Sequence, residues 1–158
     1  MDERVVREQL AAALRGGEAH TTWRAALNGI PAALRGKRPR GLAHSPWELL
    51  EHLRIAQWDI LQFSRDAAHV SPAFPSGYWP AQAAPSSAGA WAKSLRGFRA
   101  DLEAMIALVL DPAIDLTAPL AHGQGQTLMR EALLVVAHNG YHLGQMIATR
   151  RLLGAWKA

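Results

Sequence analysis

The stretch SPWELLEHLRIAQWDILQFSRDAA, residues 45–68, decides the fold. Ser45 suits the cap of a helix, Pro46 suits its first position, and Glu48 completes a capping box three residues after the cap. The apolar residues that recur at helical spacing after the cap are Leu49, Leu53, Ala56, Ile60 and Phe63. The sequence therefore predicts an amphipathic helix that begins at Ser45 and runs to about Ala68.

Helical periodicity also governs the chain on both sides of this stretch. It predicts helices at residues 2–15, 87–110 and 127–153, each ended by Gly, Pro or a cap signal, and a shorter amphipathic piece at 23–34. The basic, turn-rich segment 35–44 is typical of a surface connection. Because strand alternation, internal repeats and low-complexity segments are all missing from the sequence, we predict one all-α domain over residues 1–158, a four-helix bundle.

A long proline-rich loop separates two of these helices. Residues 70–86 carry Pro72, Pro75, Pro80 and Pro85, which forbid a regular helix. The loop also holds three aromatic residues, namely Phe74, Tyr78 and Trp79. Loops of this length are usually functional or disordered, and three aromatic side chains favour order. We expect the loop to pack across one end of the bundle.

The composition excludes several classes of protein. Hydrophobic residues make up 49% and charged residues 19% of the 158 residues, which excludes disordered and fibrous chains. The chain has no cysteine, which excludes disulfide scaffolds, thiolate metal sites and a cysteine nucleophile. No apolar run approaches the ~18–20 residues of a membrane span, and the charged N-terminus does not resemble a signal peptide. We expect a cytoplasmic protein with no membrane partner.

The basic balance is modest and does not indicate a nucleic-acid partner. Lys and Arg number 17 against 13 Asp and Glu, and the resulting net charge of +4 is spread along the chain. The densest basic run, RGKRPR at residues 35–40, is short and contains no aromatic residue of the kind that stacks on bases. We therefore expect no nucleic acid among the partners.

Three of the seven histidines lie on predicted core faces. His138 and His142 are four residues apart, so one helix turns both imidazoles toward the same point. They share an otherwise apolar stripe with Leu134 and Val135, and His52 lies on the core face of a different helix. Clustered imidazolium groups would repel one another in a core, whereas a shared divalent cation binds the neutral nitrogens. The four other histidines are expected in solvated or capping roles: His20, His44, His69 and His122, of which His44 lies closest to the predicted helix of His52.

Two segments carry a resemblance to a known family. ELLEHL at residues 48–53 and AHNGYHLGQM at residues 137–146 resemble the DinB-like superfamily, also called YfiT-like, and the likeness extends over nearly the whole chain. Members are four-helix bundles with an unusual connection order, and many bind a divalent metal, nickel or zinc among them, through three histidines. The resemblance implies that His52, His138 and His142 are these ligands. It implies no single activity, because members include thiol-dependent S-transferases and isomerases as well as suspected hydrolases.

Three neutral ligands leave a coordination position open, which is typical of catalytic rather than structural zinc. Imidazole suits zinc, nickel, copper and iron alike, with zinc or nickel favoured by the resemblance.

Glu48 is either a fourth ligand or general base, or only the capping-box residue. Glu131 is either a partner of the ligand shell or part of a buried ion pair. The side chains expected to line a substrate pocket are Tyr78 and Trp79 in the loop segment 74–80, together with Tyr141 and Gln145.

The sequence supports two functional hypotheses. One is a metal-dependent enzyme that hydrolyses a small molecule or transfers a low-molecular-weight thiol to it. The other is a non-catalytic metal-binding or damage-response protein with a structural metal.

A homodimer is also expected, through an apolar face of the last helix opposite the histidines, where Gly140 and Gly144 would admit a second helix. The alternative is that another helix of the same chain covers this face.

Overall fold

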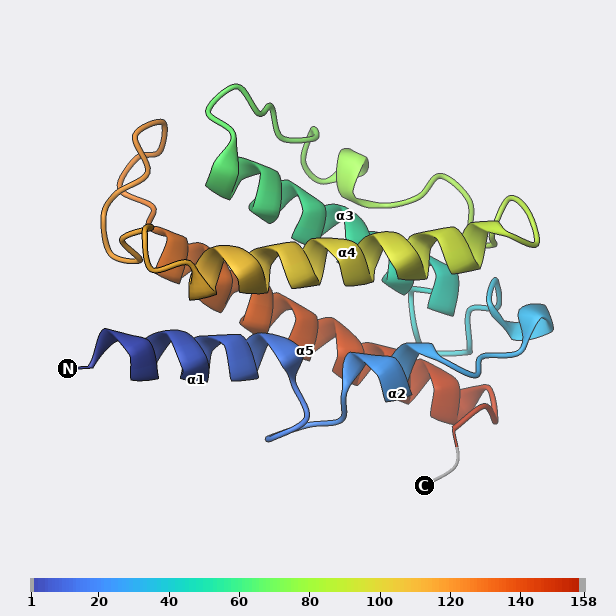
Figure 1. Cartoon of the computed structure of the whole chain (residues 1–158). Coiled ribbons are helices and arrows are strands. Elements are labelled where there is room, and N and C mark those ends of the chain that lie inside the picture. The colour runs from blue at the N-terminus through green and yellow to red at the C-terminus, as the bar shows by residue number, and fades with distance from the viewer. Residues whose placement is uncertain (1, 157–158) are drawn as a thin grey trace.

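The computed structural model describes residues 2–156, and in these residues it contains helices and no strand. Four long helices make the bundle: α1 (Glu3–Arg15), α3 (Pro46–Arg65), α4 (Ala90–Leu110) and α5 (Leu128–Leu152). The shorter elements are α2 (Trp23–Leu27) and the 3-10 turns η1 (Ala32–Leu34) and η2 (Ser76–Tyr78). The prediction of an all-α four-helix bundle with a long proline-rich loop is confirmed (Figure 1).

The start of α3 follows the predicted capping box. The Ser45 hydroxyl accepts a hydrogen bond from the Glu48 backbone N–H at 3.2 Å, and the Glu48 carboxylate accepts one from the Ser45 N–H at 2.8 Å. The predicted end was wrong by three residues, because α3 stops at Arg65. Asp66 is extended, and its carboxylate accepts the Ala68 N–H at 2.9 Å, a local turn that competes with further helix.

The helices pack around one apolar core. α3 lies against both α4 and α5, and α1 lies against α4 and α5. α2 continues roughly along the line of α1 and covers the far part of α5 (Figure 1). The largest fully buried side chains come from all of these layers and include Phe98, Leu27, Leu53, Leu102 and Met146. None of the helices in residues 2–156 has the length and apolar character that crossing a membrane requires.

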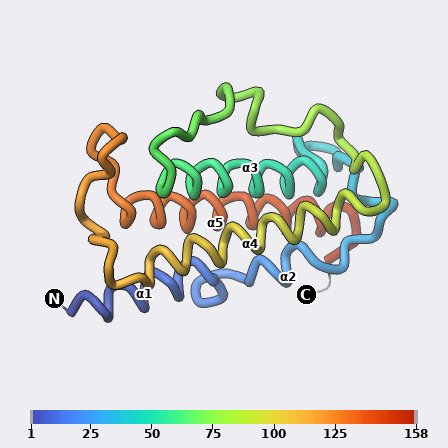
Figure 2. The backbone as a smooth tube through the Cα atoms, turned by 45° about the horizontal axis from the view of Figure 1, so that its top comes forward, coloured from blue at the N-terminus to red at the C-terminus, as the bar shows by residue number. Residues whose placement is uncertain are grey.

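The proline-rich loop runs along the side of α3, not across one end of the bundle as we expected. α3 and α4 point in the same direction, so the chain must travel back over the length of α3 before α4 begins (Figure 2). The loop is tethered near both ends of this path. Tyr78 donates its hydroxyl to Asp59, and the Ser45 hydroxyl donates to the Ala83 carbonyl at 2.5 Å. The expectation failed because it ignored the relative direction of the two helices.

Candidate metal centre

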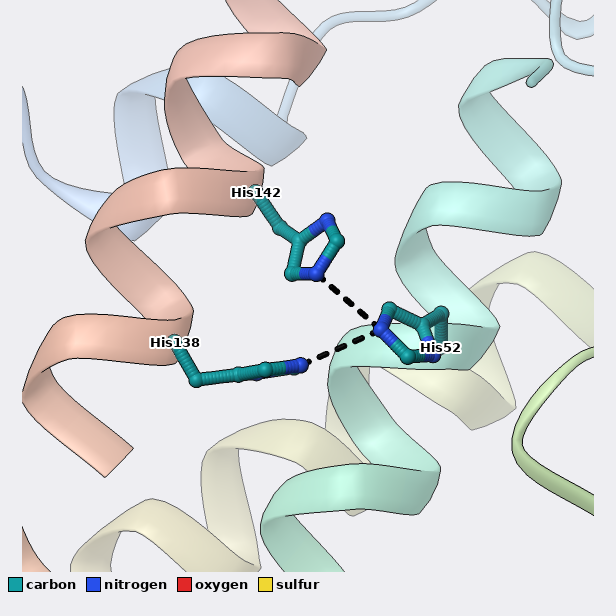
Figure 3. A group of neighbouring side chains, drawn as sticks. All are labelled: His52, His138 and His142. Carbon is teal, nitrogen blue, oxygen red and sulfur yellow. Dashed lines mark hydrogen bonds between the residues drawn. The ribbon is translucent and has the colours of Figure 1, made fainter. Parts of the chain in front are cut away.

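Three imidazoles meet at the seam between α3 and α5. His52 points from α3 toward His138 and His142, which lie one turn apart on α5 (Figure 3). The His52 Nε2 atom is 3.0 Å from His142 Nε2 and 3.1 Å from His138 Nε2. In a tetrahedral zinc site with Zn–N bonds of about 2.0–2.1 Å, two ligand nitrogens lie about 3.3 Å apart. Two of the separations are therefore close to those of ligands around one cation, and the three ligand atoms all lie within 4.8 Å of one another.

The outer nitrogens of two rings are held by oxygen acceptors. His52 Nδ1 lies 2.9 Å from the Tyr78 carbonyl oxygen, and His142 Nδ1 lies 2.8 Å from Gln145 Oε1. An oxygen of this kind only accepts, so each Nδ1 carries the proton and donates it. The Nε2 atom of each neutral ring is then a lone pair directed at the centre. This is the tautomer that a histidine needs to bind a metal through Nε2.

The lone pairs on His52 Nε2 and His142 Nε2 cannot form a hydrogen bond with each other. At 3.0 Å the Nε2 atoms of His52 and His142 are close enough for a hydrogen bond, yet neither has a proton to donate in this tautomer. His138 adds a third nitrogen, 3.1 Å from His52 Nε2. A divalent cation resolves the conflict because it accepts the lone pairs of His52 and His142 at once, and His138 adds a third when this ring carries its proton on Nδ1. The donor set therefore fits a metal ion, although it does not discriminate between metals.

The electrostatics of the cluster keep the rings neutral. Burial, followed by the nearby His142 and His52 rings, lowers the pKa of His138 to about 4. Burial also lowers the pKa of His142 to about 4, despite the opposing effect of its hydrogen bond to Gln145, and it lowers the pKa of His52. At pH 7 His138 and His142 are therefore free bases. No proton has to be displaced before they bind a cation.

An aromatic stack covers the outer side of His52. The Trp79 ring lies parallel to the His52 ring, with centroids 3.9 Å apart and an interplanar angle of 1°. On its other face Trp79 stacks on His44, at 4.0 Å and 15°. The stack fixes the plane of the metal-facing ring. It also gives His44, whose position the sequence left open, a place two rings away from the site.

The loop is anchored to α3 by a buried cluster that sequence reasoning missed. Asp59 accepts hydrogen bonds from the Tyr78 hydroxyl at 2.6 Å and from His69 Nε2 at 2.7 Å. Burial and the Asp59 carboxylate raise the pKa of Tyr78 to about 12, so the phenol keeps its proton. His69 was expected in a solvated or capping role, but only 8% of its side chain is exposed and its ring bonds Asp59. The signal available was the position of Asp59, two turns after His52 on one face of α3.

The two candidate carboxylates have partners of their own. Glu48 receives hydrogen bonds from Arg38 and from the Ser45 N–H, and Arg38 chiefly lowers the pKa of Glu48 to about 2 despite the cost of burial. Glu131 is buried and pairs with Arg130 at 2.5 Å. Of the roles that the sequence left open, the structure shows the capping box for Glu48 and the ion pair for Glu131.

The four expected pocket residues occupy different positions. Gln145 holds His142, Trp79 stacks on His52, and Tyr78 binds α3 through its hydroxyl. Tyr141 is 65% exposed, and its ring meets the edge of His142 with centroids 4.9 Å apart. Leu134, predicted on the interior stripe with the histidines, is 39% exposed, so this side of α5 opens to solvent beside the site.

Comparisons with known proteins support a family assignment. A family model described as the DinB superfamily matches residues 7–146. The match extends from α1 through most of α5 and includes all three clustered histidines. Neither the curated proteins nor the solved structures yielded a match.

Proposed function

Since the chain belongs to the DinB superfamily, we propose that it is a metal-dependent enzyme that acts on a small molecule through a divalent cation held by His52, His138 and His142. The observation that carries the proposal is the 3.0 Å approach of two Nε2 lone pairs, each fixed by an acceptor on the other ring nitrogen. Zinc or nickel is the proposed metal, and the cytoplasm is the proposed location.

The chemistry follows from the donor set. A divalent cation bound by three neutral imidazoles keeps its full charge and makes a nucleophile from water or a small thiol at neutral pH. The residues of the chain orient the site. Tyr78 and Gln145 set the tautomers of two ligands, and Trp79 fixes the plane of His52. Hydrolysis and thiol transfer are the two reactions that this arrangement supports.

Neither carboxylate near the site is proposed as a general base. A carboxyl with a pKa of about 2 is a weak base, and both oxygens of Glu48 accept hydrogen bonds from Arg38. Glu131 is only 2% exposed and pairs with Arg130. We assign both residues structural roles, which leaves activation of the nucleophile to the cation.

A non-catalytic metal-binding protein is the second candidate. The observation that favours it is the anchored loop, which places Trp79 directly on one ligand and is tied to α3 at Asp59 and Ser45. The two candidates differ in whether an added ligand reaches the cation. Displacement of a bound water by a small metal-binding ligand favours the enzyme, and a cation that no ligand perturbs favours the structural role.

The primary test is metal binding by the purified protein. One first-row divalent ion per chain is expected by elemental analysis. Replacing any of the three histidines by Ala should weaken metal binding by more than about 100-fold. Removing a residue that only hydrogen-bonds a ligand weakens it by about 10–100-fold, and the loss of the ligand itself should cost more. His122→Ala is the matched control, because this exposed histidine bonds only the Phe63 carbonyl. Protein that neither contains nor takes up a metal would refute the proposal.

A further inference from the structure

The segments around the three histidines are almost free of charged residues. Residues 67–92, which contain the whole loop, include no Asp, Glu, Lys or Arg, and neither do residues 132–149 of α5. Charged residues make up 19% of the chain, so about eight would be expected over these 44 positions at the average frequency. The loop and the exposed side of α5 therefore form an uncharged surround for the site.

The acidic groups near the histidines on the two helices that carry the ligands are paired within the protein. On α3 and α5, the carboxylates within two turns of a histidine each have a protein partner. The ion pairs are Glu48–Arg38, Glu51–Arg54 and Glu131–Arg130, and Asp59 is bound by Tyr78 and His69. None of these groups is available to an ionic ligand unless an existing pair is broken.

An exposed apolar strip runs along α5 beside the ligands. The strip comprises Leu133, Leu134, Ala137, Tyr141, Gly144 and Ala148, all of which are exposed. Leu134 precedes His138 by one turn, and the Tyr141 ring touches the edge of His142. Leu133 and Tyr141 expose 51% and 65% of their surface, which is costly unless something covers them in function. The strip thus begins at the metal ligands and continues away from them.

We propose that the site takes an uncharged small molecule whose metal-binding group reaches the three histidines while its apolar body lies on the strip of α5. The inference rests on the proposed function, because the cation supplies the attachment point. It narrows the substrate class: apart from the group that binds the cation, a zwitterionic or anionic body would bring its charges against the uncharged segments of the loop and α5. Charged low-molecular-weight thiols are disfavoured on the same ground, and an apolar co-substrate is favoured.

Cobalt-loaded protein provides a direct test, because its visible absorption changes when a ligand binds the metal. Three probes share a hydroxamate group: acetohydroxamate, benzohydroxamate and 4-carboxybenzohydroxamate. We expect benzohydroxamate to bind at least about tenfold more tightly than acetohydroxamate, through burial of its ring. The added carboxylate should weaken binding by at least about tenfold.

Two variants on the strip and one control locate the effect. Tyr141→Ser and Leu134→Ser should reduce the advantage of benzohydroxamate over acetohydroxamate. Leu134→Ser should do so with the cobalt spectrum without ligand unchanged. Leu152→Ser is the matched control, since Leu152 is 61% exposed on the same face of α5 but lies ten residues beyond His142, about 15 Å along the helix and out of reach of a small ligand. It should behave as the unmodified protein does.

The outcomes separate this inference from the function on which it rests. Failure to take up cobalt would overturn both. Equal affinities for the three probes, or a preference for the carboxylated one, would overturn the substrate class alone. Sedimentation equilibrium showing a dimer that Tyr141→Ser dissociates would also overturn it, because a second copy would then be what covers the strip.

Discussion

At the scale of single residues, Tyr78 connects the loop to the metal ligands. Its hydroxyl donates to Asp59, and its carbonyl accepts from His52 Nδ1 at 2.9 Å. Asp59 follows His52 by seven residues, which places it about 10 Å further along α3. One residue therefore bridges two turns of the helix. The position of its side chain and the orientation of the metal-facing imidazole are coupled.

The first prediction concerns this bridge. Tyr78→Phe removes the hydroxyl and its bond to Asp59, and lets the carbonyl that orients His52 move, while His69 still bonds Asp59. Metal affinity should fall by up to about tenfold. This is the lower end of the loss in metal affinity that follows removal of a residue hydrogen-bonded to a ligand. Competition with a chelator of known affinity measures this change.

Ser64→Ala is the control for this variant, since it also removes a hydroxyl contact on α3, the bond from Ser64 to the Ile60 carbonyl at 2.7 Å. It should destabilise the helix slightly and leave metal affinity unchanged. Equal metal affinities for Tyr78→Phe and the unmodified protein would show that the bridge does not position His52.

Residue patterns predicted the ligands but not their supports. The i, i+4 spacing of His138 and His142 appears directly in the sequence, and the expected grouping with His52 matches the structure. The contact between Asp59 and Tyr78 joins residues 19 positions apart, one on a helix and one in a loop without periodicity. No local spacing signals such a contact, because it depends on the path that the loop takes over α3.

At the scale of secondary-structure elements, short-range rules predicted the start of α3 well. The capping box involves residues three apart, so its hydrogen bonds follow from the helix alone. The path of the loop does not follow from local rules. It depends on α3 and α4 pointing the same way (Figure 2), which core packing decides after all the helices have formed.

The second prediction tests the structural role of Glu48. Its pKa of about 2 in the folded protein lies below the ordinary value of 4.5, so the ionised carboxylate stabilises the fold above pH 4.5. This contribution disappears as the pH falls from 4.5 to about 2. Glu48→Gln should lower the free energy of unfolding by about 1–2 kcal/mol at pH 7, allowing for solvent screening at the half-exposed Arg38.

Urea denaturation from pH 7 to pH 3 should show the Glu48→Gln and unmodified curves converging at the acid end. Glu8→Gln serves as the control because the Glu8–Arg4 pair is exposed, and its curve should stay with the unmodified protein throughout. Metal affinity should be unchanged in Glu48→Gln; a large loss of it would restore Glu48 as a ligand or catalytic group.

The third prediction concerns the docking of α1 on α4. Arg7 is 5% exposed and donates to the carbonyl oxygens of Val109, Asp111 and Ile114 at 2.7, 2.8 and 2.5 Å. Arg7→Met keeps the apolar stem and leaves these carbonyls without their donor. The free energy of unfolding should fall by about 2–4 kcal/mol, whereas Arg4→Met on the exposed side of α1 should cost less than about 1 kcal/mol. Equal losses would contradict the docking role.

At the scale of the whole molecule, the face expected to form a homodimer is largely occupied within the chain. Leu143 is buried, and Val136 and Ile147 pack against the core. A Cβ atom at Gly140 would lie 3.3 Å from the His20 ring, so the segment between α1 and α2 already approaches this glycine closely. Cover by the same chain therefore holds at Gly140, whereas Gly144 is exposed with no atom within 4 Å of a Cβ there, and a homodimer stays a prediction.

At the level of the histidines α3 and α5 lie side by side, and a cation bound there would join the two helices. Because the unfolded chain scatters the three ligands, the metal binds the folded state preferentially. At a free metal concentration 100 times the dissociation constant, the added stability is about 2.7 kcal/mol. For a chain of this size, that corresponds to a rise in Tm of about 5–11 °C. Thermal denaturation with and without zinc or nickel measures it, and a chelator should reverse it.

His52→Ala should abolish this rise, since α3 would then contribute no ligand, while His122→Ala should keep it in full. A rise that persists in His52→Ala would mean that the metal stabilises the protein from another position and that the seam between α3 and α5 is not where it binds. A rise that is lost in His52→Ala and kept in Tyr78→Phe, at saturating metal, would separate the two roles: the ligand makes the cross-link, and the loop only tunes its affinity. The thermal stability of the whole protein thus measures metal binding between α3 and α5.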